Sequence, residues 1–154
     1  QGKKFRIIKL RTMITNAEKN GAQWADKSDI RITRIGKLLR KLRIDELPQL
    51  ILVLSGEMSL IGPRPERPKI DILLRKHIPN YDLRYSIKPG ISGWAQVNYP
   101  YGASIEDSKQ KLSYDIYYLK NFSIFLDIMI FFKTLKLIIN AKGSTPVNSK
   151  KNNK

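Results

Sequence analysis

Residues 33–55 read TRIGKLLRKLRIDELPQLILVLS and predict two consecutive helices that meet near Asp45. Thr33 can cap the first helix, because a threonine side chain accepts a hydrogen bond from the free amides of a first helical turn. The apolar residues that follow recur at helical spacing with basic residues on the other faces, which predicts a basic amphipathic helix. Proline is tolerated in a first turn, so Pro48 places the start of the second helix at or just after Asp45. The Ser-Gly pair at 55–56 ends that helix.

The segments on either side are predicted from turn residues and from apolar spacing. Residues 3–13 alternate loosely between apolar and basic residues and can form a short strand or an extended segment, while 14–28 form a loop or a short helix beside a loop. The sequence SLIGPRPERP at 59–68 is rich in proline and is expected to be an ordered loop rather than regular structure. A helix is expected over about 69–78, and the Pro-Gly turn with a short alternating run at 88–98 predicts a small β element.

Two further helices are predicted toward the C-terminus. Ser104 with Asp107 resembles a capping pair for one helix, and Ser123 can cap a final helix within the apolar stretch 122–139. That stretch contains charged residues that make a bilayer-crossing helix costly, so a helix in a membrane interface and a core helix both stay open. The Lys-, Asn- and Ser-rich residues 142–154 are expected to form a disordered basic tail.

The composition limits the classes of protein to which the chain can belong. Its 154 residues suit one domain. Lys and Arg total 29 against 13 acidic residues, and the formal charge of +16 favours nucleic acid, anionic lipid or phosphorylated small molecules as partners. The absence of cysteine excludes disulfides, Cys-ligated zinc and thiol nucleophiles, and the single histidine excludes the usual multi-histidine metal sites.

Asp45 and Glu46 are the residues best placed to carry chemistry. Adjacent carboxylates on a helix point about 100° apart, but at a helix start both can converge on one ligand. A helix start also suits a bound phosphate, and the two carboxylates could hold a divalent metal or attack phosphorus. The structural alternative makes Asp45 an N-cap and Glu46 a favourable first-turn acid, and spacing alone favours that alternative.

Four basic residues could bind phosphate. Arg64 stands between two prolines with Arg67 nearby, and stiff flanking backbone can present an arginine fork for bidentate phosphate contact. Lys9 and Arg11 are two residues apart, which in a strand would place both on one face as a second clamp. A solvated turn and solvated basic side chains are the corresponding structural interpretations.

Asp115 lies within the helix predicted from about 104 to 121, beside its apolar stripe. A partly buried acid in so basic a chain can anchor the fold through a salt bridge or orient a neighbouring catalytic group. The anchor is the simpler interpretation of its position.

Four runs in order resemble one known family. They are RITRIGKLLRKLRIDELPQL, MSLIGPRPERP, KPGISGWAQVNYPYGAS and KLSYDIYYLKN. Together they look like the bacterial sugar transferases, the polyprenyl-phosphate phosphoglycosyl transferases that start exopolysaccharide, capsule and O-antigen assembly. The resemblance covers the chain from residue 5 to about residue 139.

The resemblance implies a two-step transfer. Asp45 matches the family's nucleophile, which attacks the β-phosphate of a UDP-sugar, expels UMP and forms a phosphosugar-aspartate that a polyprenyl phosphate then attacks. Glu46 matches the second acid of the family's pair, with a role in binding Mg²⁺, to which Asp45 could also contribute. The matched positions imply phosphate-handling roles for Lys9 and Arg64 and a supporting role for Asp115.

The family's fold implies an α+β, predominantly helical, membrane-associated catalytic domain with a small β element. The domain is expected over 1–141, on the cytoplasmic face of the bacterial inner membrane. Family members normally carry a membrane segment before the block that holds Lys9, and the chain is expected to lack it. The alternatives are a basic nucleic-acid-binding module, although no signature for nucleic acid is found, and an inactive membrane-surface remnant.

Overall fold

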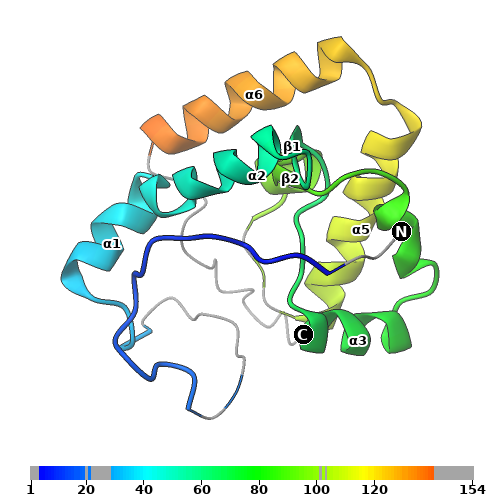
Figure 1. Ribbon diagram of the computed structural model, residues 1–154. Helices are drawn as coiled ribbons and strands as arrows, with labels where there is room; N and C mark the ends of the chain where they lie inside the picture. Colours follow the sequence, from blue (N-terminus) through cyan, green and yellow to red (C-terminus); the bar gives the residue numbers. More distant parts are fainter. Residues whose placement is uncertain (1–3, 20, 22–28, 101, 103, 141–154) are drawn as a thin grey trace, which may run out of the picture.

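The computed structural model describes residues 4–19, 21, 29–100, 102 and 104–140 (Figure 1). The tail predicted at 142–154 lies outside these residues. Within them the chain is α+β and mainly helical, as expected. The elements are α1 (Arg34–Lys41), η1 (Ile44–Gln49), α2 (Leu50–Leu54), β1 (Ser59–Ile61), α3 (Pro68–His77), η2 (Tyr81–Ser86), β2 (Gly90–Ser92), α4 (Trp94–Asn98), α5 (Ile105–Lys120) and α6 (Ile124–Ile139).

The first part of the chain is extended and leads into α1 (Figure 1). A strand and an extended segment were both predicted as possible for 3–13. Among the described residues, 4–12 form no strand and are an extended segment. An antiparallel bridge joins Met13 to Ile32. Thr33 then caps α1 as predicted, because its Oγ1 accepts the Gly36 amide at 2.9 Å. The helix stops before Arg43, which adopts a left-handed conformation with φ of 58°.

A two-stranded parallel sheet lies at the centre of the fold. Strand β1 pairs with β2 in the register Ser59↔Gly90 and Ile61↔Ser92. The backbones approach so closely that a Cβ at Gly90 would lie 2.1 Å from the Gly62 nitrogen, which explains the glycine there.

Two predictions near these strands were partly wrong. The segment 59–68, expected to lack regular structure, begins with β1, and the β element expected over 88–98 is β2 followed by the short helix α4. The strands are three residues each, and their pairing partner is distant in sequence, so local alternation could not reveal it.

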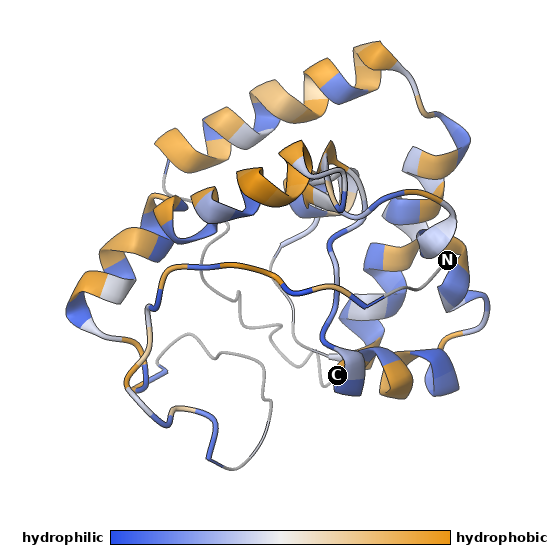
Figure 2. Cartoon of the chain, in the orientation of Figure 1, coloured by the Kyte–Doolittle hydropathy of each residue, from blue (hydrophilic) through white to orange (hydrophobic). Residues whose placement is uncertain are grey.

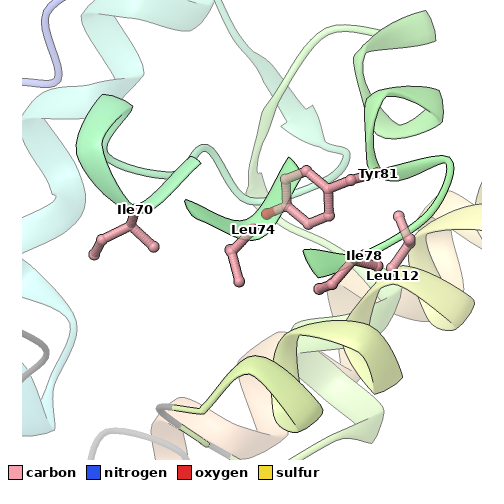
Figure 3. Close-up of a cluster of buried hydrophobic side chains, with 5 residues drawn as sticks. All are labelled: Ile70, Leu74, Ile78, Tyr81 and Leu112. Carbon is pink, nitrogen blue, oxygen red and sulfur yellow. The ribbon is translucent and has the colours of Figure 1, made fainter. Parts of the chain in front are cut away.

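Two buried clusters hold the helices together, and the second of them includes a residue of the sheet. The first joins α3, η2 and α5 through Leu74, Tyr81 and Leu112 and their neighbours (Figure 3). The second joins β1, α5 and α6 through Ile61, Tyr118 and Ile130. Because α5 contributes to both clusters, it fixes the C-terminal helices relative to the segment that follows β1.

The C-terminal helices begin as predicted. Ser104 and Asp107 form a reciprocal capping box on α5, and Ser123 caps α6 by accepting the Leu126 amide at 3.3 Å. Helix α6 is mostly apolar with a few polar positions along its length (Figure 2), and it buries Ile130 completely while Phe125 is 80% exposed. It therefore serves as a core helix along one stripe while a wide apolar face stays uncovered. Among the helices in the described part of the chain, none has the length and apolar character needed to cross a bilayer.

Candidate active site

Asp45 and Glu46 lie in the first turn of η1, a 3-10 helix that leads directly into α2. The predicted helix start near Asp45 is therefore confirmed, although its first turns are 3-10 rather than α-helical. The cap position of η1 is occupied by Arg43, which makes no side-chain capping bond. Asp45 is not an N-cap, so that part of the structural alternative is wrong, whereas Glu46 is an acid of the first turn as that alternative expected.

Glu46 is the centre of a cluster of basic side chains from three parts of the chain. Its carboxylate accepts hydrogen bonds from both terminal nitrogens of Arg64, the one from Nη1 at 3.2 Å. Lys9 Nζ lies 3.1 Å from Glu46 Oε1, and Arg43 Nη1 lies 3.8 Å from Oε2. The predicted neighbours Lys9, Arg64 and Glu46 are therefore in contact, although they come from segments far apart in the sequence.

The charges within this cluster shift one another's titration. Burial opposes ionisation of Glu46, but the Arg64 guanidinium, with Lys9 and Arg43, outweighs it and holds the pKa of Glu46 well below its usual range. Burial and the charge of Arg64 lower the pKa of Lys9, against the attraction of Glu46. The lowered pKa favours the anionic form of Glu46, which contacts all three basic side chains.

Asp45 differs from its neighbour in having a free oxygen. The residue is 8% exposed, and among the described residues its Oδ1 has no hydrogen-bond partner. Burial and the adjacent Glu46 raise the pKa of Asp45, and Lys9, Arg40 and Arg43 oppose that shift. Its main chain is held from the other side, because the Leu10 amide donates to the Asp45 carbonyl at 3.0 Å. The result is a fixed carboxylate with an uncommitted oxygen beside a set of cations.

Asp115 lies outside this cluster and is connected to it through Arg84. It is 3% exposed on α5 and pairs with Arg84 of η2, whose Nη2 lies 3.1 Å from its Oδ2. Burial, against the attraction of Arg84, raises the pKa of Asp115 to about 6. The same Arg84 nitrogen donates to the main-chain carbonyl of Arg64 at 2.6 Å. Asp115 thus anchors a salt bridge, as the simpler interpretation held, and that bridge touches the backbone of Arg64.

Two predicted phosphate-binding residues lie outside the cluster around Glu46. Arg67 Nη1 pairs with Glu18 at 2.5 Å, at an exposed position. Arg11 is exposed and lines a shallow hollow with residues 12–19 and Arg40. Lys9 and Arg11 were expected to share a face if their segment formed a strand, and residues 4–11 form no strand.

Sequence reasoning missed Arg43 and Arg84. Arg43 was grouped with the other basic residues of the first helix, although its position next to the Asp-Glu pair was a signal in the sequence itself. Arg84 had no such signal, because its partners Asp115 and Arg64 are contributed by other elements.

The donors available for a metal ion are two carboxylates. Within the described residues, no group of three or more His, Asp or Glu side chains could enclose an ion. The uncommitted Asp45 Oδ1 could supply one ligand, whereas both Glu46 oxygens already contact basic side chains. Mg²⁺ is often held by one or two carboxylates together with substrate phosphates, so the residues present fit an ion that binds with a phosphate ligand.

Comparisons with known proteins agree on one family. The sequence profile of the bacterial sugar transferases matches residues 1–141. A UDP-N-acetylgalactosamine-undecaprenyl-phosphate N-acetylgalactosaminephosphotransferase of Aeromonas hydrophila is 51% identical over 140 residues, which cover 91% of this chain and 33% of that protein. A UDP-glucose:undecaprenyl-phosphate glucose-1-phosphate transferase of Caulobacter vibrioides is 39% identical over 93% of this chain and 54% of its own length.

A shorter relative is matched more completely. The uncharacterized sugar transferase EpsL of Bacillus subtilis is 39% identical over 96% of this chain and 69% of its own length. The chain therefore spans about a third to about two thirds of the length of these relatives.

Proposed function

The chain belongs to the bacterial sugar transferase family, and from that premise we propose that it transfers a sugar 1-phosphate from a UDP-sugar to a polyprenyl phosphate carrier. The observation that carries the proposal is the buried, unpartnered Oδ1 of Asp45 beside the contacts of Glu46 with Lys9 and Arg64. A nucleophile with a free oxygen next to fixed cations is what displacement at phosphorus requires.

In the first half-reaction, the Asp45 carboxylate attacks the β-phosphorus of the UDP-sugar. A bond forms between a carboxylate oxygen and that phosphorus, and the bond from phosphorus to the oxygen that bridges the α- and β-phosphates breaks. The electron pair leaves with the bridging oxygen as UMP. The enzyme then holds the sugar 1-phosphate as an acyl phosphate on Asp45, and no redox partner is needed.

In the second half-reaction, a phosphate oxygen of the polyprenyl phosphate attacks the same phosphorus. The bond from phosphorus to Asp45 breaks, the carboxylate is regenerated, and the lipid leaves as polyprenyl-diphosphate-sugar. Both displacements use one carboxylate, so the site needs a single positioned phosphorus rather than two substrate sites open at once.

The basic side chains supply the electrostatic part of the mechanism. Arg64 offers a planar fork suited to two phosphoryl oxygens, and Lys9 offers a point charge. Both are held in place by Glu46, so little reorganisation is needed when negative charge develops on phosphorus and on the leaving group.

We further propose that Mg²⁺ binds with the diphosphate of the donor. Asp45 and Glu46 are the candidate protein ligands: Asp45 Oδ1 is uncommitted, whereas Glu46 would have to exchange a contact with a basic side chain for the ion. The remaining ligands would come from phosphate and water. A bound Mg²⁺ supplies Lewis-acid neutralisation of diphosphate charge. The chain's own contribution is the orientation of the two carboxylates in the first turn of η1.

The exposed apolar surface supports a place at a membrane. Helix α6 presents Phe125 and Phe132 at 80% and 63% exposure, and Leu54 at the end of α2 is 87% exposed. Apolar faces on a chain of formal charge +16 suit an interface of acyl chains and anionic headgroups. We place the protein at the cytoplasmic face of the bacterial inner membrane, as an initiating enzyme for exopolysaccharide, capsule or O-antigen synthesis.

The identities with the relatives suggest which donor to try first. The Aeromonas relative, whose name specifies N-acetylgalactosamine, is 51% identical, whereas the Caulobacter relative named for glucose is 39% identical. UDP-N-acetylgalactosamine is therefore the first donor to test, and UDP-glucose is the second.

The decisive experiment looks for the covalent intermediate. The chain in lipid nanodiscs is incubated with Mg²⁺ and each UDP-sugar, and mass spectrometry searches for a phosphosugar on the peptide that contains Asp45. We expect an adduct with at least one donor, its release when polyprenyl phosphate is added, and its absence in Asp45→Asn. Asp82→Asn, at an exposed acid on η2, is the matched control and should form the adduct normally. An adduct that persists in Asp45→Asn would refute the assignment, as would no adduct with any donor.

A further inference from the structure

Arg84 is a buried arginine that the proposed mechanism does not use directly. Its side chain is 7% exposed and meets Asp115 and the Arg64 carbonyl through the same terminal nitrogen. The other terminal nitrogen donates to the hydroxyl of Tyr81, and the guanidinium lies 5.0 Å from the centre of that ring. Arg84 therefore joins η2, α5 and the segment after β1 at one point.

The contact with Arg64 is to its main chain, while the Arg64 side chain reaches Glu46. Two prolines flank Arg64, so its backbone has few alternative conformations. Because its carbonyl is also held, the Arg64 side chain extends from a fixed main-chain position. The Gly90 amide also donates to the Pro63 carbonyl at 3.0 Å, which ties the preceding peptide to β2. Arg84 holds the next carbonyl along the chain, that of Arg64, in the same way.

We propose that Arg84 is a positioning residue: held by Asp115, it fixes the main chain at Arg64 and thereby the orientation of the Arg64 fork at Glu46. The inference rests on the proposed function, because it assigns Arg84 a role in the transfer reaction. In this arrangement Asp115 holds the Arg84 guanidinium and does not contact substrate.

Arg84→Lys is the first test variant. Lysine keeps a positive charge beside Asp115, so the buried carboxylate stays paired, but a single ammonium lacks the arginine fork that reaches Asp115, Arg64 and Tyr81 together. We expect kcat for adduct formation to fall by about 10- to 100-fold with little change in KM, as a small misplacement of a catalytic group can cause. Arg75→Lys is the matched control, because Arg75 also pairs with an aspartate and stacks on a tyrosine, at an exposed site on α3. It should leave the rate unchanged.

A double-mutant cycle separates positioning from general support of the fold. If Arg84 acts through Arg64, then Arg84→Lys should reduce the rate by less than about 2-fold when Arg64→Ala is already present. Equal losses in both backgrounds would overturn the inference. If Arg84→Lys does not fold, Arg84→Met combined with Asp115→Leu replaces the buried pair by apolar groups and enters the same cycle.

A second readout does not depend on activity. The order parameter of the Arg64 side chain, measured by NMR on its Nε–H group, should fall in Arg84→Lys and stay the same in Arg75→Lys. An unchanged order parameter in Arg84→Lys would overturn the positioning role. A wild-type chain that forms no adduct would instead defeat the proposed function, and the order parameter would still decide the role of Arg84.

Discussion

Lys9 Nζ lies 3.1 Å from Glu46 Oε1, although 37 residues separate the two in the chain. The contact brings the N-terminal extended segment to the first turn of η1 and places a cation next to Asp45, whose pKa it pulls downward. Glu46 acts on the same carboxyl in the opposite sense, because its negative charge disfavours a second anion beside it. Lys9 therefore lowers the pKa of Asp45, and Glu46 raises it.

The rate of adduct formation should fall at acidic pH, and substitution of Glu46 or of Lys9 should shift the pH of this fall in opposite directions. Burial and Glu46 raise the pKa of Asp45 above its ordinary value of 3.8. If Asp45 is the nucleophile, as proposed, the rate should fall as acidification protonates it through that raised pKa. Glu46→Gln removes the repulsion and should move this fall to lower pH. Lys9→Met removes an attraction and should move it to higher pH.

The measurement is the rate of adduct formation from neutral pH down to about pH 4, with circular dichroism at each pH to show that the chain stays folded. The variants are compared by the pH at which the rate falls to half of its maximum, not by the maximal rate, because both substitutions also lower the maximal rate. Shifts of both variants in the same direction would contradict the assignment of this fall in rate to Asp45.

Removal of Arg84 should destabilise the fold strongly. Arg84→Ala leaves Asp115 buried at 3% exposure without its ionic partner, and the loss of one member of such a pair costs about 3–5 kcal/mol. Arg84→Met with Asp115→Leu should recover most of that loss, because no charge is then buried. Urea unfolding of the wild type and of these variants gives the free energies. A loss below about 1 kcal/mol for Arg84→Ala would mean that solvent reaches Asp115.

The apolar face of α6 should matter for membrane binding and not for folding. Phe125→Ser with Phe132→Ser changes two exposed side chains and should weaken binding to anionic vesicles several-fold while the free energy of unfolding shifts by less than about 0.5 kcal/mol. Ile130→Ala, on the buried stripe of the same helix, is the reverse control and should cost about 2–5 kcal/mol. Vesicle sedimentation and urea unfolding separate the two effects. Unchanged sedimentation of the double variant would argue against α6 as the contact.

Gly90→Ala should disturb both the sheet and the site. The new Cβ would lie 2.1 Å from the Gly62 nitrogen and 2.5 Å from the Ser92 oxygen, so the strands must separate. Overpacking of this kind costs about 1–3 kcal/mol, and the shift also pulls on Pro63, whose carbonyl accepts the Gly90 amide. Thermal unfolding and adduct formation should therefore both decline. Lys88→Ala, at an exposed position just before β2, serves as the control and should change neither.

Local chemistry in the sequence was enough to predict three of the helix starts. Thr33, Ser104 and Ser123 each cap a helix as expected, because a capping side chain bonds to amides only two or three residues away. The same locality explains why the Asp-Glu pair was placed correctly in a first turn, although the 3-10 character of that turn was not foreseen.

Features that depend on distant partners were beyond local sequence patterns, although the family resemblance had already assigned Lys9, Arg64 and Glu46 to one site. The three-residue strands β1 and β2 carry too short a pattern to reveal a parallel pairing between residues about 30 apart. In the sequence Arg84 could not be distinguished from a solvated arginine, because its partner Asp115 lies on another helix. Arg67 shows the reverse error, because its place near Arg64 in the sequence suggested the site, whereas its side chain turns to Glu18.

The Leu10 amide holds the carbonyl of Asp45 by a bond between main chains, and this has a consequence for engineering the protein. Such a bond does not depend on side-chain identity, so the extended segment could be exchanged for that of a divergent relative while the hydrogen bond to the Asp45 carbonyl is kept. Proline at position 10 is the exception, because it has no amide hydrogen to donate. Chimeras that swap residues 4–11 while keeping Lys9 are thus a practical way to vary this edge of the domain, and they leave in place the buried Thr12, whose Oγ1 accepts a hydrogen bond from Arg40.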